Sequence, residues 1–405
     1  MHHDNGIWVG KEDLVRDEQF LQTTRQEFSV ENIDQTDGQW STNRRDFLKL
    51  MGFGLGAATV AASCEIPVKR AIPYVTKPDE IVPGIANYYA SSFVNGGDYC
   101  ALLVKTREGR PIKIEGNTLS SVTAGGTSAR AQASVLSLYD TKRIKFAGAV
   151  AEGAVSEKSW SDLDREIKSK LAAGGAVRII TGTHLSPTAS KAIGEFVARY
   201  PGTQVVQYDP VSSAALLEAN EKTFGQRAVA DYSFDKADVI VSFGADFLGT
   251  WISPIEYARQ YAGNRRTSNI KKSRKMSRHY QVESFMSLTG SNADSRILIK
   301  PSEQGAAICA LYNEVAALSG GGGIGGPKVN DKAAASLKKV AKDLVAAQGR
   351  SLVVTGSNNV MEQIIVNKLN AMLGNLNNTV SFSSASNQRQ GDERNIKRCI
   401  DEMNG

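Results

Sequence analysis

Cysteine and histidine are scarce in this sequence and are not clustered. The four cysteines stand at positions 64, 100, 309 and 399, so no pair has CxxC, CxxCH or ferredoxin-type spacing. The four histidines, at positions 2, 3, 184 and 279, offer no pair spaced to share one helical face. Because iron–sulfur clusters and c-type haem are held by closely spaced cysteines, neither is expected here. Metal binding by this chain alone is not expected either.

Long apolar runs are also missing. The weakly apolar stretch from Leu50 to Ala62 has 13 residues. As a helix it would reach about 20 Å, whereas the hydrocarbon core of a bilayer is about 30 Å thick. We therefore expect this stretch to be a targeting segment and not a permanent membrane span.

The sequence has no large excess of either charge. Lys and Arg number 48 against 42 Asp and Glu, which gives a net charge of +6. Much of this excess lies in one basic run, from Arg265 to Arg278. Such a run is either a solvated loop or a contact for an acidic partner or anionic lipid headgroups. The composition is not that of a nucleic-acid-binding protein, and 405 residues predict two or more lobes.

The apolar stretch is the second part of a predicted export signal that begins at Arg44. Arg44 and Arg45, followed by Phe47, Leu48 and Lys49, resemble the twin-arginine signal that a receptor reads before moving a folded protein across a membrane. The alternative is a buried Gly/Ala-rich helix that happens to follow two arginines. A polar arm, residues 1–43, precedes the signal, and either stays on the cytoplasmic side or is removed by cleavage. The signal predicts a protein exported to the periplasmic face of a bacterial inner membrane.

A cysteine follows the apolar stretch directly. Cys64 comes after Ala61, Ala62 and Ser63, and small residues before a cysteine resemble the site at which lipoproteins are cleaved and acylated on the thiol. Two or three acyl chains would hold the protein stably at a membrane surface. The alternative is a free thiol beside an ordinary cleavage site.

A β-hairpin is predicted after an extended, proline-containing linker, residues 65–84. Residues 99–106 and 112–117 alternate apolar with charged side chains around a glycine turn. The stretch Val104 to Asn117, with the later Leu138-Tyr139-Asp140 and Lys142 to Lys145, resembles the first lobe of the molybdopterin oxidoreductase family. That family places cysteines for a [4Fe–4S] cluster around this hairpin, and here residues 86–98 and 127–130 contain none. The departure implies that the cluster is absent.

Alternating helices and strands are predicted from Trp160 onward. Helices are expected at 160–173, with Ser161 as a possible N-cap, and at 186–199, 214–220, 303–318, 333–348 and 360–373. Strands are expected at 177–182, 203–208, 237–244, 297–301 and 351–356. This alternation predicts parallel sheets flanked by helices. Thr181 to Thr183 and Ser242 to Asp246 then follow strand ends, where such sheets bind ligands, but neither stretch is a full dinucleotide motif.

A narrower resemblance covers nearly all of the chain. Asp238 to Tyr261, His279 to Asp294 and the long arm before the arginines are similar to the Tat-variant-translocated, molybdopterin-oxidoreductase-like iron–sulfur subunit of alternative complex III. This implies a respiratory assembly that passes electrons from quinol toward cytochrome c or a terminal oxidase. Integral membrane quinol-interacting subunits and a multihaem cytochrome c subunit would be its partners. Iron–sulfur clusters are expected in a ferredoxin-like domain beyond Gly405, because the sequence resembles a truncated subunit.

The expected fold class is α/β and molybdopterin-oxidoreductase-like, with parallel-sheet units, flanking helices and a small N-terminal β-rich lobe. The expected segments are an arm 1–43, a signal 44–64, a linker 65–84, a cluster-less β-rich lobe 85–148, an α/β lobe 149–318, a Gly-rich linker 319–332 and an incomplete α/β unit 333–405.

Three functions remain open from the sequence. The first is a cofactor-free scaffold in the respiratory complex, and the second is a molybdopterin-dependent oxidoreductase acting on a small oxyanion or sulfur substrate. The third is a lipoprotein that binds a soluble ligand. No catalytic, cofactor-binding or metal-ligating residue is assigned from the sequence, and Glu283 is expected to be a surface or ion-paired carboxylate.

Overall fold

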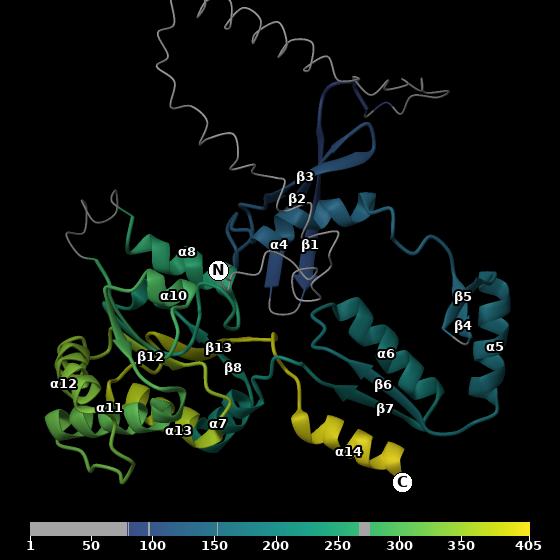
Figure 1. Cartoon of the computed structure of the whole chain (residues 1–405). Helices are drawn as coiled ribbons and strands as arrows, with labels where there is room; N and C mark the ends of the chain where they lie inside the picture. Colours follow the sequence, from purple (N-terminus) through teal and green to yellow (C-terminus); the bar gives the residue numbers. More distant parts are fainter. Residues whose placement is uncertain (1–78, 80, 96–97, 152, 267–275) are drawn as a thin grey trace, which may run out of the picture. The chain divides into compact units, whose positions relative to one another are not determined.

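Three antiparallel strands form the first part of the fold. A computed structural model describes residues 79, 81–95, 98–151, 153–266 and 276–405, and these belong to one unit of the chain, 78–405. Strand β1 (Asn87–Asn95) pairs with β2 (Asp98–Arg107), which pairs with β3 (Arg110–Gly116). Glu108 and Gly109 both have positive φ, as the two-residue turn between β2 and β3 requires. The predicted hairpin is therefore present, and β1 extends it to a three-stranded sheet (Figure 1).

A short helical segment packs on this sheet. It consists of α4 (Ala129–Ala133) and the 3₁₀ helix η2 (Ser134–Tyr139). Ser128 caps α4, because its Oγ accepts from Ala131 N at 3.1 Å. A small core of Cys100, Leu102, Ile114 and Ala131 includes Ile255 from a later helix. The β-rich part is thus fixed to the α/β part by a shared apolar contact.

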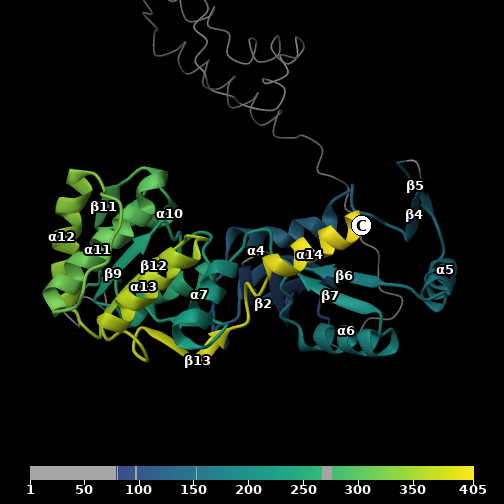
Figure 2. The same cartoon turned by 90° about the horizontal axis from the view of Figure 1, so that it is seen from below.

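A small parallel pair of strands follows in the chain. A hairpin of β4 (Gly148–Ala151) and β5 (Ala154–Glu157) leads to α5 (Trp160–Ala172), β6 (Val177–Thr181), α6 (Pro187–Arg199) and β7 (Thr203–Gln207). Strands β6 and β7 are parallel. Helix α14 (Glu393–Asn404) returns to this pair, and Arg178 Nη2 contacts Glu402 Oε2 at 2.7 Å (Figure 2).

The central sheet has four parallel strands in the order β11-β10-β9-β12. These are β9 (Val239–Phe243), β10 (Arg278–Glu283), β11 (Ser295–Leu298) and β12 (Ser351–Thr355). Its helices are α7 (Ala214–Phe224), α8 (Pro254–Gly263), α10 (Leu288–Ser291), α11 (Gln304–Ser319), α12 (Asp331–Ala346) and α13 (Val360–Met372). An antiparallel pair, β8 (Val229–Tyr232) and β13 (Val380–Ser386), and the 3₁₀ helices η3 (Phe234–Lys236) and η4 (Pro301–Glu303) complete the described elements.

Two apolar cores cover the two faces of this sheet. On one face Val241, Val282 and Val353 pack with α11, α12 and α13. On the other face Ile240 and Leu352 pack with α7, α8 and β8. Figure 1 shows α11, α12 and α13 on one side of the sheet and α8 and α10 on the other. Residues on both sides of the Gly-rich segment 319–332 therefore share one sheet and one core.

The sequence predicted about half of these elements to within a few residues. The fold class is confirmed as α/β with parallel sheets and a small N-terminal β region. The cap of α5 was wrong: Ser159, not Ser161, accepts from Asp162 N. Strands β1, β4, β5, β8, β10 and β13 and helix α8 were not predicted. Among the described residues, no helix combines the length and the apolar character needed to cross a bilayer.

Candidate functional site

The carboxyl ends of β9 and β12 approach each other closely. A Cβ on Gly356 would lie 2.5 Å from the carbonyl oxygen of Gly244, so the two loops can meet only because position 356 has no side chain. Gly244 itself has a φ of +61°, which favours glycine. Parallel sheets bind ligands at this edge. A pocket of about 150 Å³ lies here, lined among others by Ser212, Ser213, Gly244, Asp246, Ser357 and Arg389.

Several polar groups of this pocket bond to the protein itself. At the start of α7, Ala214 N donates to Ser212 Oγ at 3.0 Å, and Ala215 N donates to Asn358 Oδ1 at 3.2 Å. Arg389 Nη1 donates to Val211 O at 3.3 Å, and Gln363 Nε2 donates to Ser357 O at 2.7 Å. Helix N-termini and arginines are common anion sites. Here these four donors already have partners inside the protein.

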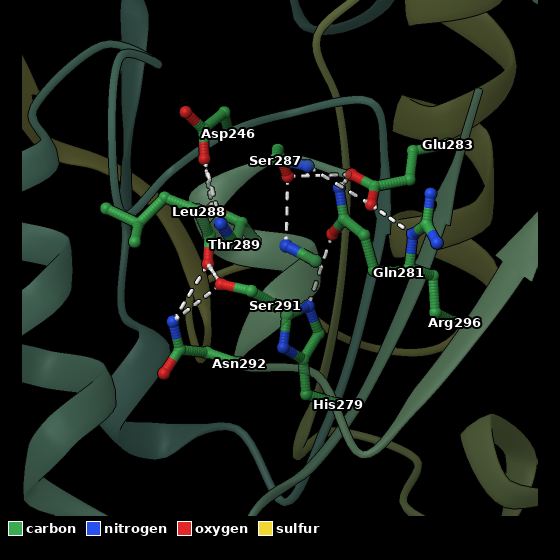
Figure 3. A network of polar contacts seen from close by, with 11 residues as sticks. Asp246, His279, Gln281, Glu283, Ser287, Leu288, Thr289, Ser291, Asn292 and Arg296 are labelled. Atoms are coloured by element: carbon green, nitrogen blue, oxygen red, sulfur yellow. Dashed lines mark hydrogen bonds and ion pairs between the residues drawn. The ribbon is translucent and has the colours of Figure 1, made fainter. Parts of the chain in front are cut away.

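Asp246 holds the loop that carries α10. Its Oδ1 accepts from Thr289 N at 2.9 Å and from Thr289 Oγ1 at 2.7 Å. The same hydroxyl oxygen accepts from Leu248 N at 2.9 Å. Figure 3 shows Asp246 directed at the Thr289 turn. The acidic residue at the strand end therefore serves as an anchor between two loops.

A row of polar side chains lies buried on one side of β10. His279 and Gln281 are 0% exposed, and Glu283 is 3% exposed. His279 Nε2 lies 3.3 Å from Gln281 Oε1, and Gln281 Nε2 donates to Glu283 Oε2 at 3.2 Å (Figure 3). Because alternate residues of a strand share a face, these three side chains form a continuous line.

Glu283 is the best-bonded member of this row. Its Oε1 accepts from Arg296 Nε at 2.6 Å, and its Oε2 accepts from Ser287 Oγ at 2.7 Å. The Ser287 backbone N–H donates to Oε1 as well, at 3.3 Å. Of the two alternatives expected for Glu283, the ion-paired one is therefore confirmed and the surface one is wrong. A buried carboxylate requires such partners.

His279 is held in its neutral form. Burial lowers the pKa of His279 to about 4, although the Gln281 side chain acts in the opposite direction. Tyr261 Oη lies 3.2 Å from His279 Nδ1 and donates to Asn292 O at 2.9 Å. The network therefore carries no positive charge on its imidazole at neutral pH.

A second, larger hollow has an acidic lining. This cleft of about 530 Å³ lies where β8, the start of α8, the end of β13 and the loop 117–125 meet. Asp231, Glu256 and Tyr257 line it, and burial raises the pKa of both carboxyl groups. Among the described residues that line this cleft there is no Lys, Arg or His.

The structure describes only some of the residues that the sequence singled out. Arg44, Arg45, Phe47, Leu48, Lys49 and Cys64 lie outside the described residues. Thr183, in the first of the two strand-end stretches, donates its Oγ1 proton to Asp209 Oδ2 at 2.6 Å. Asp246 of the second stretch lines the small pocket. Within the described part of the chain, no three His, Cys, Asp or Glu side chains gather as metal ligands.

Comparison with known proteins identifies the type of fold. No protein-family model matches the chain, and a search of curated proteins finds no match either. Acetylene hydratase from Pelobacter acetylenicus is a structural neighbour with a TM-score of 0.52 and 12% sequence identity. The likeness covers 70% of this chain and 43% of that chain. The chain has a molybdopterin-oxidoreductase-like fold.

A molybdopterin cofactor does not fit either of the two hollows described above. The strand-end pocket of about 150 Å³ is smaller than the usual small-molecule site of about 300–1,000 Å³. The acidic cleft is large enough, but its carboxylates would oppose the phosphate of the cofactor, and no base among its described lining residues would offset them. We therefore derive no chemical step through such a cofactor.

Proposed function

We propose that this chain is a structural, cofactor-free, molybdopterin-oxidoreductase-like part of a subunit of a respiratory quinol-oxidising complex of the alternative complex III type. In this role it supports electron transfer from quinol toward cytochrome c or a terminal oxidase without carrying electrons itself. The observation that carries the proposal is the strand-end pocket, which encloses about 150 Å³ and in which several polar groups bond to the protein itself.

The buried network around Glu283 supports the same interpretation. Catalytic side chains are usually accessible to a substrate, whereas Glu283 and Thr289 are 3% and 0% exposed and bond to neighbouring loops. Such groups fix the positions of loops. A rigid, redox-inactive lobe is what a neighbouring electron-transfer domain and its partner subunits would need for alignment.

The proposed setting includes export and anchoring. The twin-arginine segment would direct export in a folded state, and acylation of Cys64 would hold the mature protein at the periplasmic face of the inner membrane. The partners would be integral membrane quinol-interacting subunits and a multihaem cytochrome c subunit. Iron–sulfur clusters would belong to a separate domain of the same subunit.

Metal analysis of the native assembly tests the proposal. The protein is purified from membranes of its source in mild detergent, and molybdenum, tungsten, iron and haem are quantified per chain. We expect haem and iron to co-purify and molybdenum and tungsten to stay far below one atom per chain. Stoichiometric molybdenum or tungsten, coupled to turnover of an oxyanion or sulfur substrate, would instead support the molybdopterin-dependent oxidoreductase.

A further inference from the structure

The acidic cleft is suited to a positively charged ligand, whereas a phosphate site is suited to a negatively charged one. Its described lining brings Asp231 from β8 and Glu256 from the first turn of α8 to one hollow of about 530 Å³. This volume falls within the range of about 300–1,000 Å³ that is typical of small-molecule sites. The remaining lining is neutral and includes the hydroxyl-bearing Ser121, Ser384 and Ser386.

The two carboxyl groups are incompletely compensated. Among the described residues, the Asp231 side chain has no hydrogen bond or ion pair. The Glu256 carboxylate accepts one hydrogen bond from Ser253 and a long one, of 3.4 Å, from Gln260 Nε2. Burial is the largest influence and raises the pKa of each group, and the charge of Asp231 raises that of Glu256 further. The charge of Lys236 lowers the pKa of Asp231, and that of Arg259 lowers the pKa of Glu256, without outweighing burial. A cation placed between them would offset this unfavourable burial.

Tyr257 gives an independent indication of a ligand. This side chain lines the cleft and is 2% exposed, yet its hydroxyl has no hydrogen-bond partner in the described part of the chain. Buried tyrosine hydroxyls usually find a partner. A ligand that accepts or donates one hydrogen bond would supply it.

We propose that this cleft binds a small organic cation, through an ammonium or guanidinium group set between Asp231 and Glu256 with Tyr257 as a third polar contact. A guanidinium group has five N–H donors and can bond two carboxylates at once. The rings of Tyr99 and Tyr257 also line the cleft and suit the flat, weakly hydrated guanidinium ion. This inference does not depend on the scaffold role proposed above.

Calorimetric titration of the full-length protein tests the site. The probe is Nα-acetyl-L-argininamide (argininamide below), and the matched neutral probe is Nα-acetyl-L-citrullinamide (citrullinamide below). A urea replaces the guanidinium in the second probe, and the acetyl group removes the α-ammonium charge from both. We expect argininamide to bind saturably and about tenfold or more tighter than citrullinamide, because only the cation pairs with the carboxylates. This comparison uses the unaltered protein and so does not depend on the folding of any variant.

Variants then locate the site. Asp231→Asn and Glu256→Gln should each weaken argininamide binding about tenfold, and Tyr257→Phe about threefold. Glu195→Gln, which removes an exposed carboxylate on α6, is the control and should change nothing. Thermal unfolding of each variant shows that it is folded at the titration temperature.

The titrations also have outcomes that would overturn the inference. These are equal affinity for the two probes, no saturable argininamide binding, or binding that neither acid substitution weakens. Titration with acetyl-Gly-Arg-Gly-amide, whose only cation is the arginine side chain, separates the two sources of the cation. Weaker binding than argininamide assigns the cleft to a free small molecule, whereas equal or tighter binding assigns it to an arginine side chain of a polypeptide.

Discussion

Gly290 lies against Glu283, and a side chain at position 290 would displace the Glu283 carboxylate. A β-carbon at residue 290 would overlap the carboxylate of Glu283, whose oxygens bond to Ser287 and Arg296. Gly290 N donates to Ser287 Oγ at 2.9 Å, so the glycine also closes the turn that presents Ser287 to the carboxylate. The polar network on β10 thus depends on a missing side chain in α10.

Gly290→Ala should destabilise the protein by about 2 kcal/mol, because the new methyl group displaces a buried carboxylate from its partners. Urea unfolding at neutral pH measures the free energy of unfolding. Gly194→Ala is the matched control, since Gly194 lies in α6 with open space where a Cβ would be. That substitution should stabilise by about 0.5 kcal/mol. Equal effects of the two changes would contradict the steric argument.

The Thr289 hydroxyl should contribute to stability more than the Thr289 methyl group. Thr289→Val keeps the shape but leaves Leu248 N without its acceptor and Asp246 with one donor fewer. We expect a loss of about 2 kcal/mol, because buried polar groups would lack partners. Thr289→Ser keeps the hydroxyl and should lose about 1 kcal/mol or less. Chemical unfolding compares the two, and a larger loss for Ser than for Val would refute the anchor role.

His279 should make the fold sensitive to mild acid. Its folded pKa of about 4 lies below the ordinary value of 6.5, so the unfolded chain binds a proton first as the pH falls. His279 therefore does not change the free energy of unfolding above about pH 6.5. Between about pH 6.5 and 4 its protonation in the unfolded chain lowers the free energy of unfolding, by roughly 3 kcal/mol in all. His279→Gln cannot be protonated. Its free energy of unfolding should fall less steeply over this pH window than that of the unaltered protein, whatever its value at pH 7.

Part of this site could be predicted from the sequence and part could not. The strand ends at Gly244 to Asp246 were found because a short apolar run followed by glycine indicates the end of a parallel strand. The strand containing His279, Gln281 and Glu283 was missed. Alternating polar residues ordinarily indicate a solvent-facing side, whereas here that side packs beside Phe247 and Tyr261. Only the tertiary packing shows that these polar groups are buried.

Strand β1, which the sequence analysis did not predict, had a usable signal in the sequence. Residues Asn95 and Asp98 flank a Gly-Gly pair and are partners in the β1–β2 register. A two-residue Gly-Gly connection between apolar runs is a hairpin signal. No pattern in the sequence predicted the acidic cleft. Asp231, Glu256 and Ser386 are far apart in the sequence and meet only through the packing of β8, α8 and β13.

Export offers a prediction for the segment before the described residues. Arg44→Lys and Arg45→Lys together should keep the protein in the cytoplasm, because the receptor reads the paired guanidinium groups and lysine does not reproduce them. Fractionation of cells that express the full-length protein measures this. Lys69→Arg, which changes a basic residue outside the signal, is the control and should be exported normally.

Acylation at Cys64 can be separated from export. Cys64→Ala should leave the protein exported but release it from washed membranes when it is expressed without its partner subunits, because the acyl chains provide the anchor. Mass spectrometry of the mature N-terminus of the unaltered protein checks the modification directly. An unmodified Cys64, or a mature chain that retains the residues before it, would leave the export signal in place and remove the lipid anchor from the proposal.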